Sequence, residues 1–366
     1  MKLTIQREAL LKPLQVVTGV VERRQTLPIL SNVLMRVTES ELALTGTDLE
    51  VEIITRTPLE GANGGETTLA ARKFVDICRA LPEGAEVEIN VEGDRALIRS
   101  GRSRYTLTTL PAQEFPSLDE LKMPTRIVLP QRELKSLIEK THFSMAQQDV
   151  RYYLNGLLLE FSRERLRAVA TDGHRLALAD AALSVDVAEP RQIIVPRKGV
   201  LELVRLLGDT DEPAQLELAS NHLRVTVGPI TFTSKLVDGR FPDYNRVVPQ
   251  GGDKIVLGDR STLIAGLGRA SVLSNEKFRG VRLQLGNDAL RALVHNPEQE
   301  EAEDEMPVSY DGEGFEVGFN VQYLLDALAA VRSDQVRLVM SDANSSCLIQ
   351  GDGDESSKYV IMPMRL

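Results

Sequence analysis

The sequence lacks several residues and motifs on which common functions depend. Tryptophan is absent, aromatic residues make up 4% of the 366 residues, and there are two cysteines and four histidines. The histidines, at positions 142, 174, 222 and 295, show no His-x-x-x-His or similar spacing, so we expect no metal site. Neither a Gly-x-x-x-x-Gly-Lys-Ser/Thr loop nor a Gly-x-Ser-x-Gly motif occurs. We therefore expect no cofactor and no catalysis, and a hydrolase is an alternative without a motif in its favour.

Long apolar runs are missing as well. No stretch of about 18 apolar residues is present, so we expect no membrane-spanning helix. Residues 1–4 do not begin a signal-peptide apolar block. Cys78 lies on the apolar face of a helical pattern, and we expect Cys78 and Cys347 to be free thiols rather than a disulfide. These absences predict a cytoplasmic protein.

What the sequence does contain is a repeat of domain size. Residues 72–81 (RKFVDICRAL) return as residues 197–206 (RKGVLELVRL), at an offset of 125. Phe115-Pro116 returns as Phe241-Pro242, at an offset of 126. A nearly constant offset over such a span indicates three similar units in one chain. We predict domains at residues 1–125, 126–250 and 251–366.

Shorter matches support the repeat and indicate its fold. Residues 46–50 match residues 170–174, and residues 294–298 are a weaker third counterpart. Residues 87–91 and 216–220 alternate apolar and polar side chains, which is typical of half-buried strands. We predict an α+β fold in which helices cover one face of antiparallel sheets. The six expected helices are residues 7–24, 72–81, 132–143, 197–206, 260–272 and 320–332.

The charge is distributed unevenly between these helices and the rest of the chain. The whole chain has a formal net charge of −10, whereas the six helical patterns together carry +9 and the remainder carries −19. An acidic protein is not expected to bind nucleic acid with its whole surface. Basic helices against an acidic background instead indicate one local surface for a polyanion.

Several stretches resemble one family, the bacterial replicative sliding clamp, which is the beta subunit of DNA polymerase III. The resemblance covers essentially the whole chain and is close to the proteobacterial form. It is carried by residues 149–156 (DVRYYLNG), 170–176 (ATDGHRL), 232–244 (FTSKLVDGRFPDY), 275–283 (NEKFRGVRL) and 359–366 (YVIMPMRL).

The resemblance implies a non-catalytic processivity factor of chromosomal replication. Two chains would close head to tail into a ring, with helices lining the hole around duplex DNA and sheets outside. The implied partners are a second copy, double-stranded DNA bound without sequence specificity, the polymerase catalytic subunit and an ATP-driven clamp loader. Other polymerases, ligase and mismatch-repair proteins would bind through short linear motifs. No membrane partner is implied.

The resemblance also implies three sets of site residues. Arg24, Arg72, Gln148, Tyr152 and Tyr153 match DNA-contacting positions, and Lys198 is a further candidate because it begins a basic helix. Arginines suit phosphates, and tyrosines can stack on an exposed base. The partner-peptide pocket would comprise Leu154, Thr171, Gly173, His174, Arg175, Leu176, Pro242, Arg246, Val247, Val360, Met362 and Met364.

The third set would close the ring. By resemblance, domain one contributes Lys73, Arg102, Arg104, Tyr105 and Leu107. Domain three contributes Val272, Leu273, Glu298, Glu300, Glu301 and Glu303. Tyr105 and Val272 stand where the family often has Phe and Ile, which are mild changes. A basic strand edge would thus face an acidic run. The alternative within the binding class is a monomeric, nonring scaffold that binds DNA through its basic face.

Overall fold

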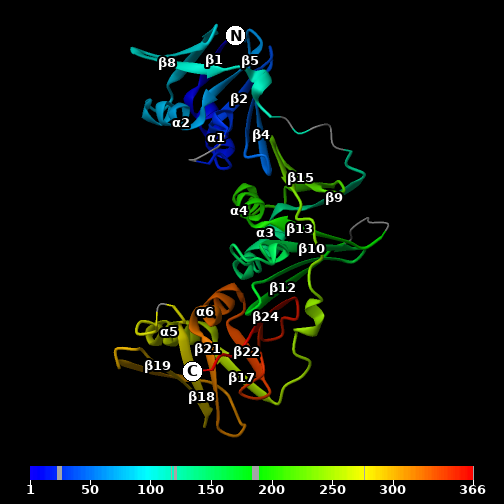
Figure 1. Ribbon diagram of the computed structural model, residues 1–366, viewed down its shortest axis with the longest axis vertical. Coiled ribbons are helices and arrows are strands. Elements are labelled where there is room, and N and C mark those ends of the chain that lie inside the picture. Colours follow the sequence, from blue (N-terminus) through cyan, green and yellow to red (C-terminus); the bar gives the residue numbers. More distant parts are fainter. Residues whose placement is uncertain (23–26, 117, 119–121, 184–188, 276, 366) are drawn as a thin grey trace. The chain divides into compact units, whose positions relative to one another are not determined.

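The computed structural model describes residues 1–22, 27–116, 118, 122–183, 189–275 and 277–365 (Figure 1). By its internal contacts the chain forms two compact units, residues 1–134 with 198–236 and residues 135–197 with 237–366. The predicted central domain is thus divided between the two units. The reason is that its strands belong to sheets that continue into the flanking parts of the chain. The predicted domain boundaries remain a prediction.

All six predicted helices are present, with two shorter than expected. Helix α1 ends at Val17 rather than residue 24, where Gly19 and a run of β-branched residues disfavour a helix. Helix α3 ends at Glu139, and a separate 3-10 turn, η3, follows at His142–Ser144. The helices are α1 (Arg7–Val17), α2 (Ala71–Ala80), α3 (Gln131–Glu139), α4 (Arg197–Leu206), α5 (Arg260–Ser271) and α6 (Val321–Ala330).

The first unit contains one twelve-stranded antiparallel sheet in the order β1-β6-β7-β8-β5-β2-β3-β4-β16-β15-β14-β9. Its strands are β1 (Lys2–Gln6), β2 (Asn32–Val37), β3 (Glu41–Thr47), β4 (Val51–Pro58), β5 (Gly65–Ala70), β6 (Glu86–Glu92), β7 (Arg95–Ser100), β8 (Ser103–Leu110), β9 (Thr125–Pro130), β14 (Pro213–Leu218), β15 (His222–Val227) and β16 (Ile230–Lys235).

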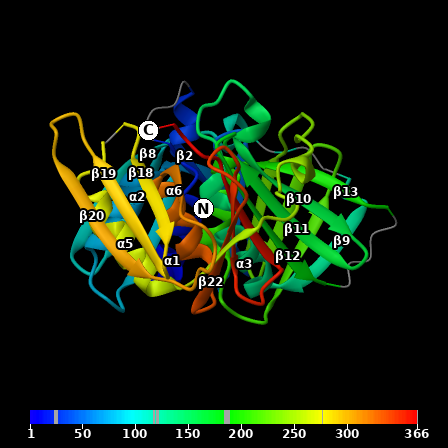
Figure 2. The same cartoon turned by 90° about the horizontal axis from the view of Figure 1, so that it is seen from below.

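The second unit contains an eight-stranded sheet, β13-β10-β11-β12-β24-β23-β22-β17, and a four-stranded sheet, β20-β19-β18-β21. In the four-stranded sheet, β18, β19 and β20 lie side by side, with α5 against β19 and β20 (Figure 2). The strands are β10 (Gly156–Ser162), β11 (Arg165–Thr171), β12 (Arg175–Ala182), β13 (Arg191–Pro196), β17 (Lys254–Asp259), β18 (Gly280–Gly286), β19 (Ala289–His295), β20 (Glu301–Pro307), β21 (Phe315–Asn320), β22 (Gln335–Met340), β23 (Cys347–Gly351) and β24 (Ser357–Ile361).

The order of elements along the chain repeats three times, as the sequence predicts. Each repeat is a strand, a helix, three strands, a further strand, a second helix and three final strands. The repeats are joined by the same antiparallel pairing, in which the last strand of one repeat pairs with the fourth strand of the repeat before it. These pairs are β16 with β4 and β24 with β12. The repeat is therefore one of backbone architecture as well as of sequence.

The matched residues 46–50 and 170–174 form the same hairpin turn. In the first, the Thr47 hydroxyl accepts from the Leu49 N–H, and the Asp48 carboxylate accepts from Glu50 and Val51 N–H groups. In the second, the Thr171 hydroxyl accepts from the Gly173 N–H, and the Asp172 carboxylate accepts from the His174 and Arg175 N–H groups. Leu49 and Gly173 both have positive φ, 77° and 89°, which costs a leucine more than a glycine.

The cores contain mainly Leu, Val, Ile and Ala, as the low aromatic content predicts. Each sheet alternates so that one face packs under helices, which is the α+β layer expected from the sequence. Cys78 and Cys347 are free and buried, as predicted. Burial raises the pKa of both thiols to about 12, so neither is a reactive thiolate at neutral pH.

Candidate binding sites

A buried apolar cluster forms where β12 and β24 pair, at the place of the predicted pocket, and its surface is called the groove below. Leu176 on β12 lies directly opposite Val360 on β24, and both are fully buried. Leu154, at the end of the 3-10 turn η4 (Tyr152–Leu154), packs in the same cluster. The connection after residue 236 adds Phe241, Tyr244 from η5 (Tyr244–Arg246), and the half-buried Val247. The structure thus brings together Leu154, Leu176, Val247 and Val360 from the predicted pocket.

The turn between β11 and β12 forms one end of this groove. Gly173 stands against the guanidinium of Arg151, and a side chain at this position would lie 2.9 Å from it. Arg151 is held in turn by Asp149, which accepts from its Nε at 3.0 Å and from a terminal nitrogen at 2.8 Å. These hydrogen bonds lower the pKa of Asp149 to about 2. The segment before η4 therefore supports the turn through the contact of Arg151 with Gly173.

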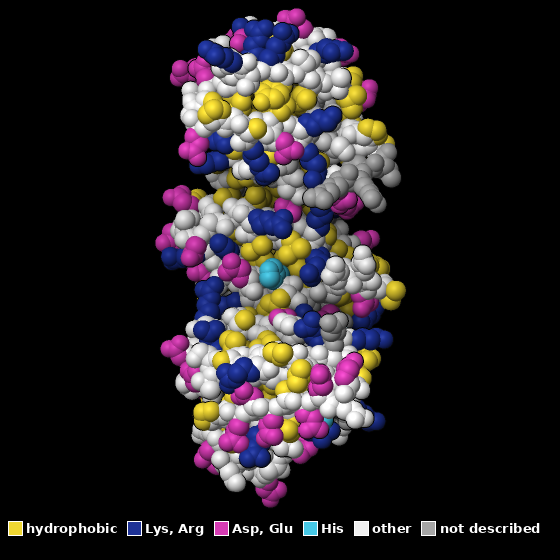
Figure 3. Space-filling model, turned by 90° about the vertical axis from the view of Figure 1, so that its left-hand side faces the viewer, with side chains coloured by type: hydrophobic (Ala, Val, Ile, Leu, Met, Phe, Trp, Pro, Cys, Tyr) yellow, Lys and Arg dark blue, Asp and Glu magenta, His cyan; other side chains and the backbone are white. Residues whose placement is uncertain are grey.

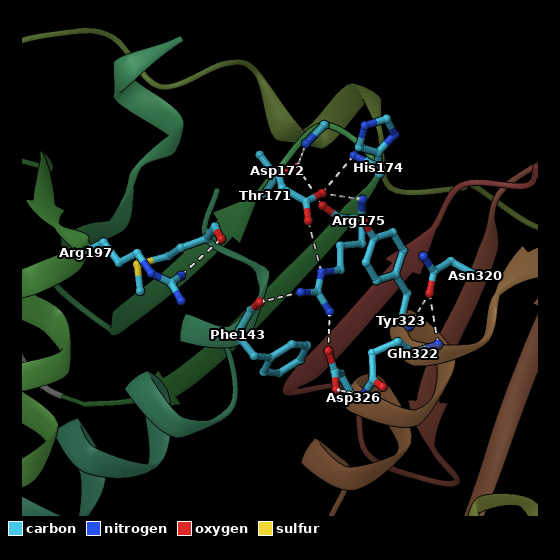
Figure 4. Close-up of polar contacts among 12 residues, drawn as sticks. Phe143, Thr171, Asp172, His174, Arg175, Arg197, Asn320, Gln322, Tyr323 and Asp326 are labelled. Carbon is cyan, nitrogen blue, oxygen red and sulfur yellow. Dashed lines mark hydrogen bonds and ion pairs between the residues drawn. The ribbon is translucent and has the colours of Figure 1, made fainter. Parts of the chain in front are cut away.

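Arg175 supports the same turn from the opposite side (Figure 4). Because side chains alternate along a strand, Arg175 lies on the helix-covered face of β12 while Leu176 faces the groove. Its guanidinium donates to Asp172 at 3.1 Å, to Asp326 of α6 at 2.5 Å and to the Phe143 carbonyl at 2.7 Å.

The same guanidinium lies 4.4 Å from the centre of the Tyr323 ring. Arg175 thus ties the turn to α6 and η3. It contributes to the groove through the backbone that it holds, not as a lining side chain.

Most of the remaining predicted pocket residues lie on the rim, and Met364 lies apart from it. His174 is exposed, and its carbonyl accepts from the Met362 N–H at 3.0 Å. Pro242 is exposed, and Arg246 is exposed and paired with Asp243. Met364, held by a bond from its N–H to the Gly318 carbonyl, lines a separate hollow of about 670 Å³. That hollow also contains Phe278, Leu293 and Arg365.

Besides Phe241 and Tyr244, two apolar strand residues of the groove were not predicted from the sequence. Leu348 on β23 lies opposite Val360, and Val339 on β22 lies opposite Leu348, and both belong to the buried cluster. The apolar patterns of residues 335–340 and 347–351 predict strands. They do not reveal which strands are neighbours, and that pairing is what brings these side chains to the groove.

The predicted DNA-contacting residues have different environments. Arg72, the second residue of α2, is exposed and has no ion pair within the described part of the chain. Gln148 is exposed with a φ of 56°. Tyr152 is 57% exposed, and its ring lies edge-on to Tyr153 at 5.8 Å. Arg24 lies outside the described residues. Lys198 pairs with both Glu22 and Asp48, so its charge is already balanced.

Several other cations on the helices are paired as well. Arg132 pairs with Asp211, Arg205 with Glu202 and Arg269 with Asp304. Figure 3 shows Asp and Glu side chains among the Lys and Arg side chains on the face that it draws. Within the described residues, the exposed helix cations without an ion pair include Lys12, Arg72, Lys73 and Arg79, all on α1 and α2. Lys12 and Arg79 were not singled out from the sequence.

The predicted interface residues lie at two strand edges and at positions outside these strands. Arg104, Tyr105 and Leu107 lie on β8, whose outer edge pairs with β5 only at residues 109 and 110. Glu301 and Glu303 lie on β20, which is an edge strand of its sheet. Val272, 78% exposed, and Leu273 line a hollow of about 470 Å³ together with Glu298 and Glu300. Lys73 and Arg102 are exposed.

Comparisons with known proteins identify the family. Models of the N-terminal, central and C-terminal domains of the DNA polymerase III beta subunit match residues 1–119, 128–243 and 245–365. The chain is 57% identical to a beta sliding clamp of Pseudomonas putida and 52% identical to that of Escherichia coli K12, over the full length of each chain. A crystal structure of the Pseudomonas aeruginosa beta subunit superposes with a TM-score of 0.97 at 54% identity, with both chains fully covered. The chain belongs to the DNA polymerase III beta subunit family.

Membership of this family bears on the hydrolase alternative, and the structure bears on metal and membrane binding. The family is a non-catalytic processivity subunit, which removes the support for a hydrolase. Within the described residues no group of three or more His, Cys, Asp or Glu side chains could hold a metal ion. The helices described here include none that is long and apolar enough to cross a membrane.

The Arg175 contacts generate a prediction. Arg175→Ala leaves Asp172 and Asp326, whose side chains are largely buried, without their cation, so we expect a loss of about 3 kcal/mol in the free energy of unfolding of the second unit. Arg175→Lys cannot bind both carboxylates and the carbonyl at once and should recover only part of it. Denaturant unfolding monitored by tyrosine fluorescence measures the loss, with exposed Arg246→Ala as the control. A change below about 0.5 kcal/mol, which is the size of ordinary surface effects, contradicts the assignment.

Proposed function

We propose that this protein is the processivity factor of bacterial chromosomal replication, acting as a head-to-tail homodimeric ring around duplex DNA. It tethers the replicative polymerase and other DNA-processing proteins through the apolar groove between β12 and β24, and a clamp loader must open the ring. The observation that carries the proposal is that β8, apart from residues 109 and 110, and β20 each have one edge without a partner strand in the described residues, whereas their counterparts elsewhere in the chain pair with each other.

The repeat gives the register of this proposed pairing. β8 is the counterpart of β16 and β24, and β20 is the counterpart of β4 and β12. The hairpin pairs Thr47–Glu52, Thr171–Leu176 and His295–Glu301 align the second group of strands. The same antiparallel register then sets Tyr105 opposite Ala302 and Arg104 opposite Glu303 of a second copy.

Tyr105 supports this pairing. It is the third residue of β8, where Phe232 is the third residue of β16 and Tyr359 the third residue of β24. Phe232 and Tyr359 are fully buried at their junctions, whereas Tyr105 is only half-buried in a single chain. A second copy that supplies β20 would bury it, and the exposed Val272 and the neighbouring Leu273 offer further apolar surface. Burial of aromatic side chains is a main source of binding energy at interfaces.

Charge complements this shape. Arg104 on β8 and the Glu301, Glu303 and Glu305 carboxylates of β20 are exposed in the single chain. Charged side chains protect an edge strand against indiscriminate pairing, and opposite charges select the correct partner edge. The interface is heterologous, so it forms a ring where the rotation closes and an open filament where it does not.

Binding of duplex DNA is proposed to depend on phosphate contacts, without contacts that read the bases. The unpaired cations Lys12, Arg72, Lys73 and Arg79 suit phosphates, and Arg24 and Lys198 remain candidates by resemblance. Tyr152 and Tyr153 are proposed to stack on an exposed single-stranded base, and Gln148 lies near them in the chain. We further propose that the protein acts in the cytoplasm, where the chromosome is replicated.

The groove is proposed to bind extended peptides whose apolar anchors pack on Leu176 and Val360. Met362 offers an adaptable rim, since its thioether side chain is exposed beside His174. Clamps of Pseudomonas aeruginosa and Bartonella birtlesii, 55% and 37% identical to this chain, have been crystallised bound to griselimycin. We propose that griselimycin binds the same groove here.

The ring predicts a mass near twice 40.4 kDa by light scattering. Arg104→Glu should shift the protein toward 40.4 kDa, because it places like charges at both interfaces. Arg104→Glu combined with Glu303→Arg should restore the dimer. Arg95→Glu on the neighbouring strand β7 is the control. A wild-type mass near 40.4 kDa at all working concentrations would instead favour the nonring scaffold.

Unpaired and paired cations should contribute differently to DNA binding. Arg72→Ala should lower the affinity for a short duplex of arbitrary sequence and reduce the slope of log affinity against log salt by about 1. Arg269→Ala removes an equal charge that Asp304 already neutralises, so it should change the slope much less. Fluorescence anisotropy over a salt series measures both. Equal slopes for the two variants argue against a direct Arg72 contact.

The rim methionines should matter for the groove and not for the ring. Met362→Ala with Met364→Ala should weaken griselimycin binding at least tenfold, a loss of about 1.4 kcal/mol, while light scattering still gives a dimer. Met364 lines the neighbouring hollow rather than the buried cluster, so Met362→Ala alone should account for most of the loss. Isothermal titration calorimetry decides the matter, and unchanged affinity in the double variant means that the groove is wrongly assigned.

A further inference from the structure

The peptide groove contains a row of side chains on five neighbouring strands. Direct cross-strand pairs connect Thr171 with Leu176, Leu176 with Val360, Val360 with Leu348, and Leu348 with Val339. Four of the five are apolar and belong to the buried cluster of the groove. In Figure 1, β12 and β24 lie next to each other in the second unit.

The fold builds the same row a second time, in the first unit. There the pairs connect Thr47 with Glu52, Glu52 with Thr233, Thr233 with Arg224, and Arg224 with Glu217. The strands β3, β4, β16, β15 and β14 are the counterparts of β11, β12, β24, β23 and β22. The two rows therefore share backbone positions and differ in chemistry, because the four apolar positions of the groove are occupied here by Glu52, Thr233, Arg224 and Glu217.

The polar row is not a fully exposed surface. Glu52 is 8% exposed and Thr233 is 2% exposed, and both line a hollow of about 300 Å³ together with Arg224. Burial raises the pKa of Glu52, although the Leu118 backbone N–H and the nearby arginines act against this. The Arg224 Nε is buried without a hydrogen-bond partner in the described residues. An apolar ligand group placed here would remove the remaining water from two charged side chains, which is costly.

We propose that Glu52, Thr233 and Arg224 are specificity-determining residues that exclude apolar peptide anchors from the first junction, at which β4 pairs with β16. Each protomer then has one peptide site, at the second junction, where β12 pairs with β24, although its fold builds the junction twice. The inference rests on the proposed peptide function of the second junction. It assigns the difference between the two rows to these side chains, because the paired strands and their register are the same.

The test uses griselimycin as the probe and the full-length protein. Leu348→Arg imitates Arg224 at the second junction and should weaken binding at least tenfold, whereas Leu348→Met should leave it nearly unchanged. Glu52→Leu, Thr233→Val and Arg224→Leu are then combined with Leu348→Arg. Because both opposite charges are replaced by apolar groups of similar size, we expect the fold to persist. Any gain in affinity of this variant over Leu348→Arg alone then arises from the first junction.

Calorimetry gives the affinity and the number of sites. We expect one site per wild-type protomer, weakened binding for Leu348→Arg, and recovered binding when the three exchanges at the first junction are added. Two sites on the wild type, or no recovery in a variant that circular dichroism shows to be folded, overturns the inference. No binding to the wild type overturns the proposed function itself and the inference with it, so the two failures are distinguishable.

If the combined variant does not fold, the pair Leu348→Arg and Leu348→Met still decides whether one row charge excludes the probe. Equal affinities for these two variants overturn the inference, because a charged residue in the row would then be tolerated. Circular dichroism and light scattering of both variants separate this outcome from unfolding or loss of the dimer.

Discussion

Antiparallel pairing between the last strand of one repeat and a strand of another is the constraint on which the structure depends. At β4–β16 and β12–β24 the backbone hydrogen bonds continue from one repeat into the next, so the sheets do not end at the predicted domain boundaries. A strand edge has unsatisfied N–H and C=O groups, which must be paired, protected or covered. A chain of three such repeats necessarily retains one unpaired edge of each kind, and a head-to-tail ring is the assembly that uses both.

Because the backbone repeats, differences in function must come from side chains that occupy equivalent positions. Leu176 and Val360 make an apolar floor where Glu52 and Thr233 make a polar one, although both pairs have the same register. The core-facing positions vary less, since Phe232 and Tyr359 are both fully buried aromatics. Selection for packing thus acts on one face of each junction and selection for binding on the other, as the two-residue period of a strand allows.

The sequence was sufficient for features that depend on local pattern. The helix at residues 197–206 has the predicted bounds, and the threefold repeat and the turns at Asp48 and Asp172 follow from direct matches. The sequence was insufficient where distant residues meet. The pairing of Lys198 with Glu22 and Asp48 could not be predicted, because these carboxylates lie about 150 to 176 residues away in the chain. For the same reason Leu348 was missed, since only the order of the strands places it beside Val360.

The ion pairs on the helices bear on how a sliding device can bind DNA at all. Each free cation near the phosphates adds a contact that must break when the protein moves, and affinity rises with the number of phosphates neutralised. Carboxylates such as Asp304 and Asp211 neutralise many helix cations, which leaves the unpaired ones concentrated on α1 and α2. Attraction is thereby kept weak and independent of sequence. Retention on DNA would then depend on the closed ring rather than on affinity, so stronger electrostatic attraction would slow movement without improving the tether.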